Sequence, residues 1–575
     1  MRGTMLWVLL LFAMLCGRVS VAVGDEADQD FLNSRDLPKS AEQLRLASAR
    51  AQAHDSAGKG PVGSRPSAKS HFGLLNYGVL ASYLACNLGV GWYLAKRQKN
   101  TNDFFRCGQR IPWWAAGIAL CGTQLSTLTF MAIPAKTYAT DWTYILVNAA
   151  IPLVAPIVVY CYLPFFRRLD VTTAYEYLEK RFNLAVRLFG SATFVLLQTS
   201  RMAIVLFLPS LALSVVSDLN LYMCILGMGL LSTLYTLMGG AEAVTWTEVL
   251  QAVILFGSAI LTLVLIAHGV SGGFRTLFAT ALADGKFHFT NWSWDFTVAS
   301  VWVVLLGNLF AQLIPYTTDQ AVIQRYLSTP DEKQAGQAIW TNALITVPAS
   351  LMFFGIGTAL YGFYKEHPQL LNPGLQMDAI FPWYIVSQMP PGVSGLVIAG
   401  LFAAGQSGTQ SSVATAIVTD FHRRFHQDLG EERLLLLARM WTVILGFVGM
   451  GAAALIATFS IQSLWDVFLA VVGLFGGGLA GIFALGIFTQ RAHGVGALIG
   501  GFTSALVLFV VQRFTPLHFF LYAPVGILSC FLIGYLASRI IPSEAQNLKG
   551  LTIYHMSSPR KAGHGNSVWV ERLES

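Results

Sequence analysis

A short polar segment interrupts an apolar stretch that is otherwise fit to cross a membrane. Residues 121–130 read C-G-T-Q-L-S-T-L-T-F, and five of these ten side chains carry a hydroxyl or an amide. Gly122 and Pro134 interrupt the helix around them. Inside hydrocarbon, irregular polar backbone survives only beside a cavity or a ligand, because a backbone group without a partner costs several kcal/mol. The segment therefore predicts a binding site at mid-membrane depth.

Arg201 is the second residue with chemistry of its own, and it lies inside the long apolar span 185–215. A guanidinium is costly within a bilayer, so such residues usually face a water-filled path or a partner. Its planar fork of N–H donors suits a carboxylate held through two hydrogen bonds. The position favours contact with an acidic solute. Internal pairing, or snorkelling toward the membrane edge, is the alternative.

The composition shows which kind of protein must position these residues. Of 575 residues, 54% are apolar and only 12% are charged, and the mean hydropathy is +0.57. Soluble globular domains of this length do not have such a composition. The formal net charge of +7 is spread over short loops, which argues against nucleic acid as a partner. Neither a C-x-x-C pair nor a histidine cluster points to a metal centre.

Apolar runs long enough to cross about 30 Å of hydrocarbon, which takes roughly 20 residues, recur along the chain. They predict an all-α polytopic membrane protein with thirteen spans. These lie near 74–95, 112–138, 143–166, 185–215, 219–239, 248–270, 297–315, 338–364, 393–420, 436–458, 464–488, 494–513 and 519–540.

The N-terminus differs from the rest of the chain. Arg2, an apolar run over 5–16 and the small residues Ser20 and Ala22 predict a signal peptide over 1–22, with a retained anchor helix as the alternative. Residues 23–70 hold too few large apolar side chains to fold alone and are expected to form a disordered extracytoplasmic tail. The transmembrane domain is then 71–541, followed by a cytoplasmic tail, 542–575.

Basic residues fall in alternate loops, which places those loops in the cytoplasm by the positive-inside rule. The N-terminal tail is therefore expected outside and the C-terminus inside, in a multi-pass protein of the plasma (inner) membrane. The residues concerned are Lys96, Arg97, Lys99, Arg167, Arg168, Arg325, Arg423, Arg424, Arg491 and Arg539.

Spans two to six (112–270) and seven to eleven (297–488) form two blocks of five. An odd number of spans gives the two blocks opposite orientations, as in an inverted repeat, leaving one extra helix before them and two after. The first span of each block contains helix-breaking residues, Gly122 to Pro134 in one and Gly307 to Pro315 in the other. Breaks at corresponding positions indicate a transporter site, although Gly and Pro are common in membrane helices anyway.

Five separated segments resemble sodium–solute symporters, and the likeness covers about 70–540. It is greatest to the sialic-acid symporter branch, and it implies the LeuT-type five-plus-five inverted repeat with sodium-coupled uptake. The segments are D-F-F-R-C-G-Q-R-I-P-W-W (103–114), T-A-Y-E-Y-L-E-K-R-F (173–182), G-G-A-E-A-V-T-W-T-E-V-L-Q (239–251), D-Q-A-V-I-Q-R-Y-L (319–327) and A-L-G-I-F-T-Q-R-A (484–492).

A sodium ion needs oxygen ligands, which unwound backbone carbonyls and hydroxyls supply. The resemblance implies that the carbonyls of Gly122 and Leu125 face Na⁺ together with Ala404 and Ser407, in A-A-G-Q-S-G-T-Q-S-S (403–412). Here the chain departs from the family, because Gly408 follows Ser407 where a second hydroxyl is usual. A nearby hydroxyl could supply the missing oxygen, and the candidates are Thr409, Ser411 and Ser412. Small residues that only allow close helix packing are the alternative.

Some members of the family hold a second sodium ion with an aspartate in W-T-D, and this chain has Glu248 in W-T-E. The extra methylene moves the carboxylate oxygens, which puts a second ion in doubt. A helix cap or a salt bridge is an equally good interpretation of Glu248.

The resemblance to sialic-acid symporters also assigns solute contacts. Arg201 would bind the solute carboxylate. Asp319 and Gln320, which begin the D-Q-x-x-x-Q-R motif, are expected to lock helix ends near the cytoplasm instead. The remaining solute contacts are Gln124, Ser126 and Thr129 on the first broken helix, Tyr144 and Asn148 where the family has Phe and Gln, and Asn308, Gln312 and Tyr316 as candidates from the second.

Together these features predict a sodium-coupled secondary active symporter that imports a sialic acid or another carboxylated sugar. The alternatives are a symporter of a neutral sugar or small organic anion, and a non-transporting sensor with the same fold. The chain carries no G-x-x-x-x-G-K-[ST] loop, which disfavours an ATP-driven pump. We expect no enzymatic activity and no cofactor besides the coupling ion, in a monomer or weak homo-oligomer.

Overall fold

The computed structural model describes residues 73–95, 106–124, 127–169, 171–217, 219–288, 291–371, 375, 377–405, 409–426, 430–459, 464–542 and 548–555. All regular elements in these ranges are helical. The longer helices are α4 Leu74–Ala95, α6 Trp113–Gln124, α7 Thr127–Ala139, α8 Leu146–Ile157, α11 Leu184–Ser217, α12 Leu221–His268, α14 Val301–Thr318, α16 Glu332–Glu366, α18 Val393–Gly405, α21 Glu431–Ile456, α23 Gly477–Phe488, α24 Gly494–Phe514 and α25 Tyr522–Ile540. The shorter ones are α9 Leu163–Arg168, α10 Ala174–Arg181, α13 Gly273–Ala283, α15 Gln320–Leu327, α17 Ile380–Gln388, α19 Thr409–Ala416, α20 Arg423–Phe425 and α22 Leu464–Val471. The expected signal peptide and extracytoplasmic tail lie outside the described residues.

Eleven of the thirteen predicted spans correspond to described helices that could cross a membrane. Ten are long and apolar enough to cross a membrane, and the bent pair α6 and α7 makes an eleventh. The predicted spans 219–239 and 393–420 correspond to shorter apolar helices, Leu221–Leu234 and Val393–Phe402. Since α12 has 48 residues, it would be about 70 Å long if straight, more than twice what one crossing needs.

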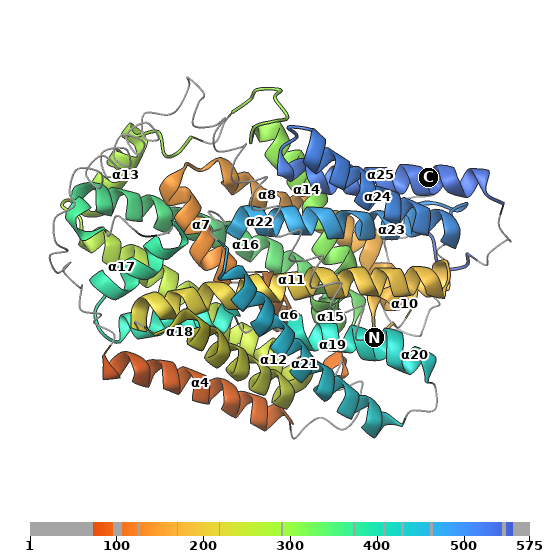
Figure 1. The fold of residues 1–575 in the computed structure, drawn as a ribbon, viewed down its shortest axis with the longest axis horizontal. Helices are drawn as coiled ribbons and strands as arrows, with labels where there is room; N and C mark the ends of the chain where they lie inside the picture. Colours follow the sequence, from red (N-terminus) through yellow and green to blue (C-terminus); the bar gives the residue numbers. More distant parts are fainter. Residues whose placement is uncertain are drawn as a thin grey trace.

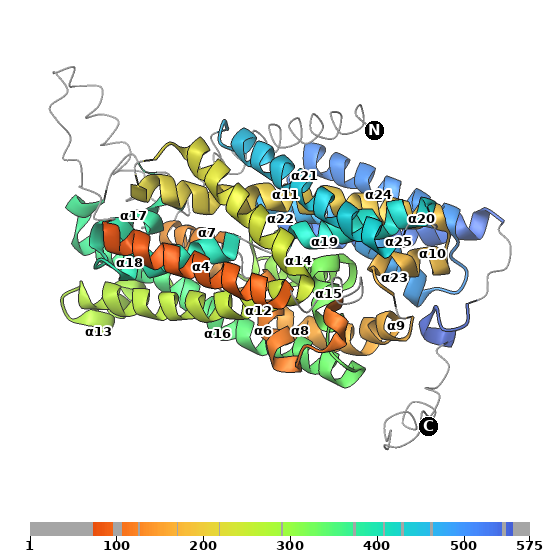
Figure 2. The same cartoon turned by 90° about the horizontal axis from the view of Figure 1, so that it is seen from below.

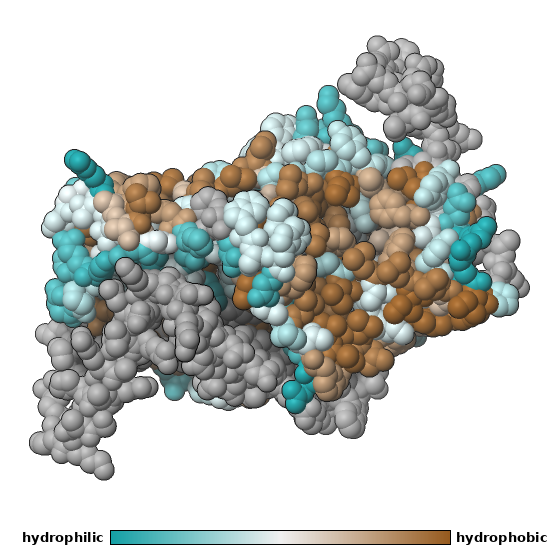
Figure 3. All heavy atoms as spheres, turned by 90° about the horizontal axis from the view of Figure 1, so that it is seen from above, coloured by the Kyte–Doolittle hydropathy of each residue, from teal (hydrophilic) through white to brown (hydrophobic). Residues whose placement is uncertain are grey.

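Most of the helices lie side by side along the long axis of the molecule. The short helices α10 and α20 gather at one end of the bundle, and α13 and α17 gather at the opposite end (Figures 1 and 2). Large apolar side chains on the outer helices are exposed, among them Phe502, Leu506 and Leu536 of α24 and α25. Figure 3 shows a broad apolar area on the face that contains these two helices. Such a surface suits hydrocarbon as the surrounding solvent.

The first predicted helix break is confirmed. The axis turns by 53° between Trp113–Gln124 and Thr129–Ala139. Residues Leu125 and Ser126 lie between α6 and α7, outside the described part of the chain. The bend therefore falls within the polar segment from which the binding site was predicted.

The second break is not where the sequence suggested, because α14 continues through Gly307 and Pro315 to Thr318. The hydroxyl of Thr318 donates to the carbonyl of Ile314 at 2.8 Å, within this helix. The break comes at Asp319, whose φ of −85° and ψ of 109° are extended. Its carboxylate accepts from the Ala321 N–H at 2.8 Å and begins α15 as an N-cap.

A buried ionic cluster joins α10, α11 and the π-helical turn Ile417–His422. Asp420 accepts hydrogen bonds from the Arg187 guanidinium at 2.6 and 2.9 Å, from Thr173 at 2.7 Å and from Ser191 at 2.9 Å. Arg187 also pairs with Glu179 at 2.7 Å. Every oxygen of the Asp420 carboxylate is therefore bonded, as a buried charge requires.

Candidate binding site between the broken helices

Arg201 is buried in the middle of α11, with 9% of its surface exposed. Its Nη2 donates to the carbonyl of Thr123 at 2.5 Å, in the last turn of α6 before the first break. Its Nη1 lies 3.5 Å from Oδ2 of Asp319, at the second break. The third nitrogen, Nε, is buried without a hydrogen-bond partner among the described residues. The Arg201 side chain thus contacts both helix breaks, and its Nε remains available as a hydrogen-bond donor.

Gln198 lies one turn before Arg201, on the same face of α11. Its Nε2 donates to Oδ2 of Asp319 at 2.5 Å, so α11 presents two donors to a single carboxylate oxygen. The sequence analysis did not identify Gln198, Asp319 or the Thr123 carbonyl as part of this site. The spacing of Gln198 and Arg201 was a usable signal, since polar residues three positions apart share a helix face.

Asp319 and Gln320 were both expected to lock helix ends near the cytoplasm. Gln320 does so, because it accepts from the Ala174 N–H at 3.0 Å and donates to the Thr172 carbonyl at 2.8 Å. Asp319 turns the other way, toward Arg201. Both residues hold helix ends, since Asp319 also caps α15. What was not expected is that the Asp319 carboxylate faces Arg201 as well.

Glu248 of α12 forms a second buried pair with Arg325 of α15. Nε and Nη2 of Arg325 lie 2.7 and 3.1 Å from the two carboxylate oxygens, and both side chains are 1% exposed. The salt-bridge interpretation of Glu248 is therefore observed. Arg325 was expected in a cytoplasmic loop, but it is buried in a helix. A Cβ on Gly122 would lie 3.1 Å from the Glu248 carbonyl, so glycine allows α6 to approach this pair closely.

The other predicted solute residues lie on the helices next to the two breaks, and some of them are outside the described residues. Gln124 is half-buried at the end of α6, and its Nε2 has no partner among the described residues. Thr129 is buried in α7. Ser126 lies outside the described residues. Asn308 is buried but donates to the Val304 carbonyl of its own helix at 2.7 Å, and Gln312, one turn further along α14, is half-buried.

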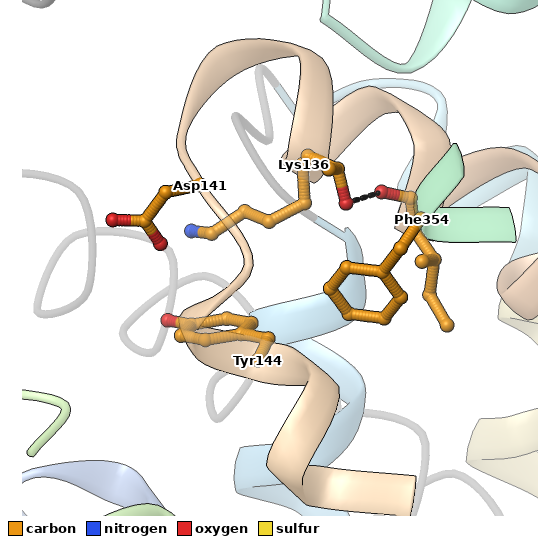
Figure 4. A pocket seen from close by; sticks show the side chains of 6 residues that line it. Lys136, Asp141, Tyr144 and Phe354 are labelled. Carbon is orange, nitrogen blue, oxygen red and sulfur yellow. Dashed lines mark hydrogen bonds between the residues drawn. The ribbon is translucent and has the colours of Figure 1, made fainter. Parts of the chain in front are cut away.

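Tyr144 lies in the 3₁₀ turn Thr143–Ile145, and Asn148 lies one turn later at the start of α8. Both are half-buried. The Tyr144 ring packs edge-on against Phe520 at 5.1 Å, and Nζ of Lys136 lies 5.1 Å from its centroid. Figure 4 shows Lys136 reaching toward Asp141 above this ring, in a small pocket lined also by Phe354. Among the described residues no hydrogen bond joins Tyr144 or Asn148 to Arg201.

The predicted sodium ligands are only partly described. Leu125 and Ser407 lie outside the described residues, and only the backbone of Ala404, in the last turn of α18, is described. Thr409 is buried at the start of α19. The hydroxyl of Ser412 donates to Gln324 at 3.1 Å, whereas the hydroxyl of Ser411 is buried without a partner in the described part of the chain.

The helical architecture and these sites together indicate the class of protein. An all-helical bundle with apolar spans, two interrupted helices and buried polar atoms at the interruptions is the architecture of a membrane transporter. The profile of the sodium:solute symporter family matches residues 104–504. The chain belongs to this family, and it is a multi-pass sodium-coupled solute symporter rather than an enzyme.

Individual relatives agree with this assignment. The sodium/sialic acid symporter NanT of Aliivibrio fischeri is 39% identical over 494 residues, covering 85% of this chain and 97% of NanT. A solved structure of a Na⁺-coupled sialic acid symporter, substrate-bound and outward-open, matches with a TM-score of 0.78 and 37% identity, over 83% of this chain and all of the other. Mhp1, a nucleobase-cation-symport-1 family transporter, matches with a TM-score of 0.54 at 15% identity over 77% of this chain and 96% of Mhp1, which shows a shared LeuT-type fold.

Proposed function

We propose that this symporter imports a sialic acid or another carboxylated sugar together with Na⁺. The observation that supports the proposal is Arg201, a buried guanidinium placed between both helix breaks with Nε still available for a hydrogen bond. Such a fork matches a carboxylate in shape and charge. Sequence similarity to NanT, which is named as a sodium/sialic acid symporter, supports the same solute class.

Polar side chains around the breaks would bind the rest of the sugar, since hydroxyls and amides match its hydroxyl groups. We assign Arg201 to the carboxylate. The unpartnered amide of Gln124 supports its inclusion, because a buried donor without a partner is costly unless a ligand completes it. The other proposed solute contacts are Ser126, Thr129, Tyr144, Asn148, Asn308 and Gln312.

For the coupling ion, the proposal keeps the carbonyls of Gly122 and Leu125 with Ala404 and Ser407. A further oxygen would come from Thr409 or from Ser411, whose hydroxyl is buried without a partner among the described residues. Glu248 is assigned to Arg325 rather than to a second ion, because its two oxygens are already bonded to a cation of the protein. This assignment leaves the carbonyl and hydroxyl oxygens as the proposed sodium ligands.

The proposal also keeps the five-plus-five inverted repeat, with one additional helix before it and two after it. The N-terminal tail would lie outside, and the end of the bundle with α10 and α20 in the cytoplasm. Basic residues support this orientation, since α10 ends with Lys180 and Arg181 and α20 begins with Arg423 and Arg424.

The test is uptake of labelled N-acetylneuraminic acid into proteoliposomes. We expect uptake with an inward sodium gradient, none when potassium replaces sodium, and loss of at least about 100-fold in Arg201→Ala, which corresponds to about 2.7 kcal/mol. The neutral sugar N-acetylmannosamine serves as the control solute. Uptake of the neutral sugar alone, or full uptake without sodium, contradicts the proposal, and wild-type uptake of the acid by Arg201→Ala removes Arg201 from the solute site.

A further inference from the structure

We propose that Asp319 is the internal counter-ion of Arg201 and that the solute carboxylate replaces it on binding, which couples solute binding to the break between α14 and α15. This inference rests on the proposed function, because it needs a solute whose carboxylate binds Arg201. It adds a positioning residue, which acts on the solute through another side chain.

Among the described residues, the side chains around Arg201 supply no second uncommitted cation for a solute carboxylate beside Asp319. Asp319 is 5% exposed, and Arg201 is the cation with which it pairs. The neighbouring Arg325 is already bonded to both oxygens of Glu248. A solute carboxylate bound beside Asp319 would leave one negative charge buried without compensation, and that costs several kcal/mol. The two carboxylates therefore compete for the one guanidinium, and the solute displaces Asp319 when it binds.

The contact that Asp319 makes is weak enough to be exchanged. It consists of one N–O approach of 3.5 Å, while Nε of Arg201 has no partner among the described residues. A carboxylate that accepts two parallel N–H bonds would form them at about 2.7–2.9 Å. A solute carboxylate can therefore bind Arg201 more strongly than Asp319 does.

Asp319 also keeps other partners when Arg201 leaves. Gln198 donates to the same Oδ2 at 2.5 Å, and the Ala321 N–H donates to Oδ1 at 2.8 Å. The residue before it, Thr318, accepts from the Tyr175 hydroxyl at 2.6 Å, and Tyr175 belongs to α10. The break is thereby joined by a hydrogen bond to α10 at the end of the bundle, and a movement of Asp319 would act on this bond.

The exchange also explains how this carrier could reorient after it releases solute. The empty carrier must reorient with Arg201 still buried, and an unpaired guanidinium in the membrane interior is costly. Asp319 supplies the missing negative charge for this step. Exchange of internal for external solute does not need it, because the carrier then reorients with a solute carboxylate on Arg201.

Asp319→Asn separates the two steps while its amide oxygen still caps α15. In the full-length protein, we expect N-acetylneuraminic acid to bind at least about 5-fold more tightly, because the competing charge is gone. Sodium-driven net uptake should lose about 10-fold in kcat with a lower KM, while solute exchange stays within about 2-fold of wild type. A purely structural role would lower net uptake and exchange together.

Two further variants keep the test decisive. Gln198→Ala removes the donor that competes with Arg201 for the Asp319 carboxylate, so binding of the acid should weaken by about 3-fold. Asp420→Asn, an equal change in the ionic cluster of α10 and α11, should leave the affinity unchanged. Unchanged affinity in Asp319→Asn, or equal loss of exchange and net uptake, overturns the inference. The proposed function fails separately, if the wild-type protein takes up only the neutral sugar or needs no sodium.

Discussion

Two of the buried arginine–carboxylate pairs in this bundle, Arg325 with Glu248 and Arg201 with Asp319, differ in their hydrogen-bond geometry. Arg325 holds both oxygens of Glu248 at 2.7 and 3.1 Å. Arg201 approaches one oxygen of Asp319 at 3.5 Å and keeps Nε unpaired among the described residues. The first pair is complete and the second is not. We infer that the Arg325–Glu248 pair stabilises the fold, whereas Arg201 retains a donor that can bind a ligand.

The difference follows from the backbone beneath each carboxylate. Glu248 stands in the continuous helix α12, and its neighbour Gly122 lets α6 pack closely against it. Asp319 stands at a helix break, where its carboxylate must also cap α15 and accept from Gln198. Of the three contacts of the Asp319 carboxylate, those with Ala321 and Gln198 are short, and the contact with Arg201 is long at 3.5 Å. Arg201 is therefore left with unused bonding capacity.

The largest effect is expected from Glu248→Ala. It leaves Arg325 buried without a counter-charge, and removing one member of a buried pair costs about 3–5 kcal/mol. Purified protein in detergent should show a large fall in the thermal midpoint, and much less folded protein should be recovered. Glu432→Ala, at an exposed site on α21, is the control and should change stability by less than about 0.5 kcal/mol. A wild-type midpoint in Glu248→Ala would refute the structural role of this pair.

Arg201→Lys should reverse the pattern, with a large effect on binding and a small one on stability. The charge remains, but an ammonium cannot present two parallel donors to a carboxylate. We expect N-acetylneuraminic acid to bind about 10- to 100-fold more weakly by calorimetry in sodium buffer, which is about 1.4–2.7 kcal/mol. The thermal midpoint without solute should stay close to wild type. A large fall in that midpoint would mean that both pairs serve the fold.

The matched change at the other pair is Arg325→Lys. It keeps the charge opposite Glu248 but loses one of two charge-assisted hydrogen bonds, so we expect a stability loss of about 1–2 kcal/mol. Solute affinity should be unchanged, because Arg325 is bonded to the protein and does not reach the solute. Thermal unfolding and calorimetry on the same preparation measure both quantities. Weaker solute binding in this variant would place Arg325 in the solute site.

The sequence predicted the first helix break and Arg201 better than the second break and Asp319. The polar segment at Gly122 and the charge at Arg201 stand out because hydrocarbon excludes such groups, so the first break and its neighbour could be found from residue types alone. The second break could not, because Pro315 and Gly307 are tolerated inside α14 and the real break depends on how Asp319 caps α15. Local composition identifies polar residues in a membrane span. It does not show which partner each one meets.

Long-range pairing was also hidden in the sequence. Arg325 looked like a loop residue marking the cytoplasmic side, and its partner Glu248 lies 77 positions away. The resemblance to the symporter family made Glu248 a candidate ligand of a second sodium ion. A salt bridge was an equally good interpretation of this residue. The structure shows the salt bridge. Only the fold decides between such alternatives, because a buried carboxylate attracts any cation that its neighbours can supply.

Lys286 offers a third kind of buried cation, which bonds to carbonyl oxygens instead of a carboxylate. It follows α13 in a loop between membrane spans and is 1% exposed. Its Nζ donates to the carbonyls of Tyr138 at 2.7 Å and Thr140 at 2.6 Å, where α7 ends, and lies 4.1 Å from the centroid of the Tyr361 ring. Burial lowers the pKa of Lys286 from 10.5 to about 8, against the opposing charges of Asp141 and Asp284.

The pH dependence of stability should therefore reveal Lys286, with the smallest effect of the four. Between pH 8 and 10.5 the unfolded chain keeps a proton that the folded chain has lost, so the free energy of unfolding rises with pH in this window. Relative to Lys286→Met, wild type should gain about 1 kcal/mol between pH 7.5 and 9. Lys365→Met, which removes a half-exposed lysine paired with Asp284, is the control and should follow wild type. If the free energy of unfolding changes with pH in parallel for wild type and Lys286→Met, the pKa of Lys286 is not lowered. The carbonyl oxygens would then stabilise its charged form as well as a carboxylate does.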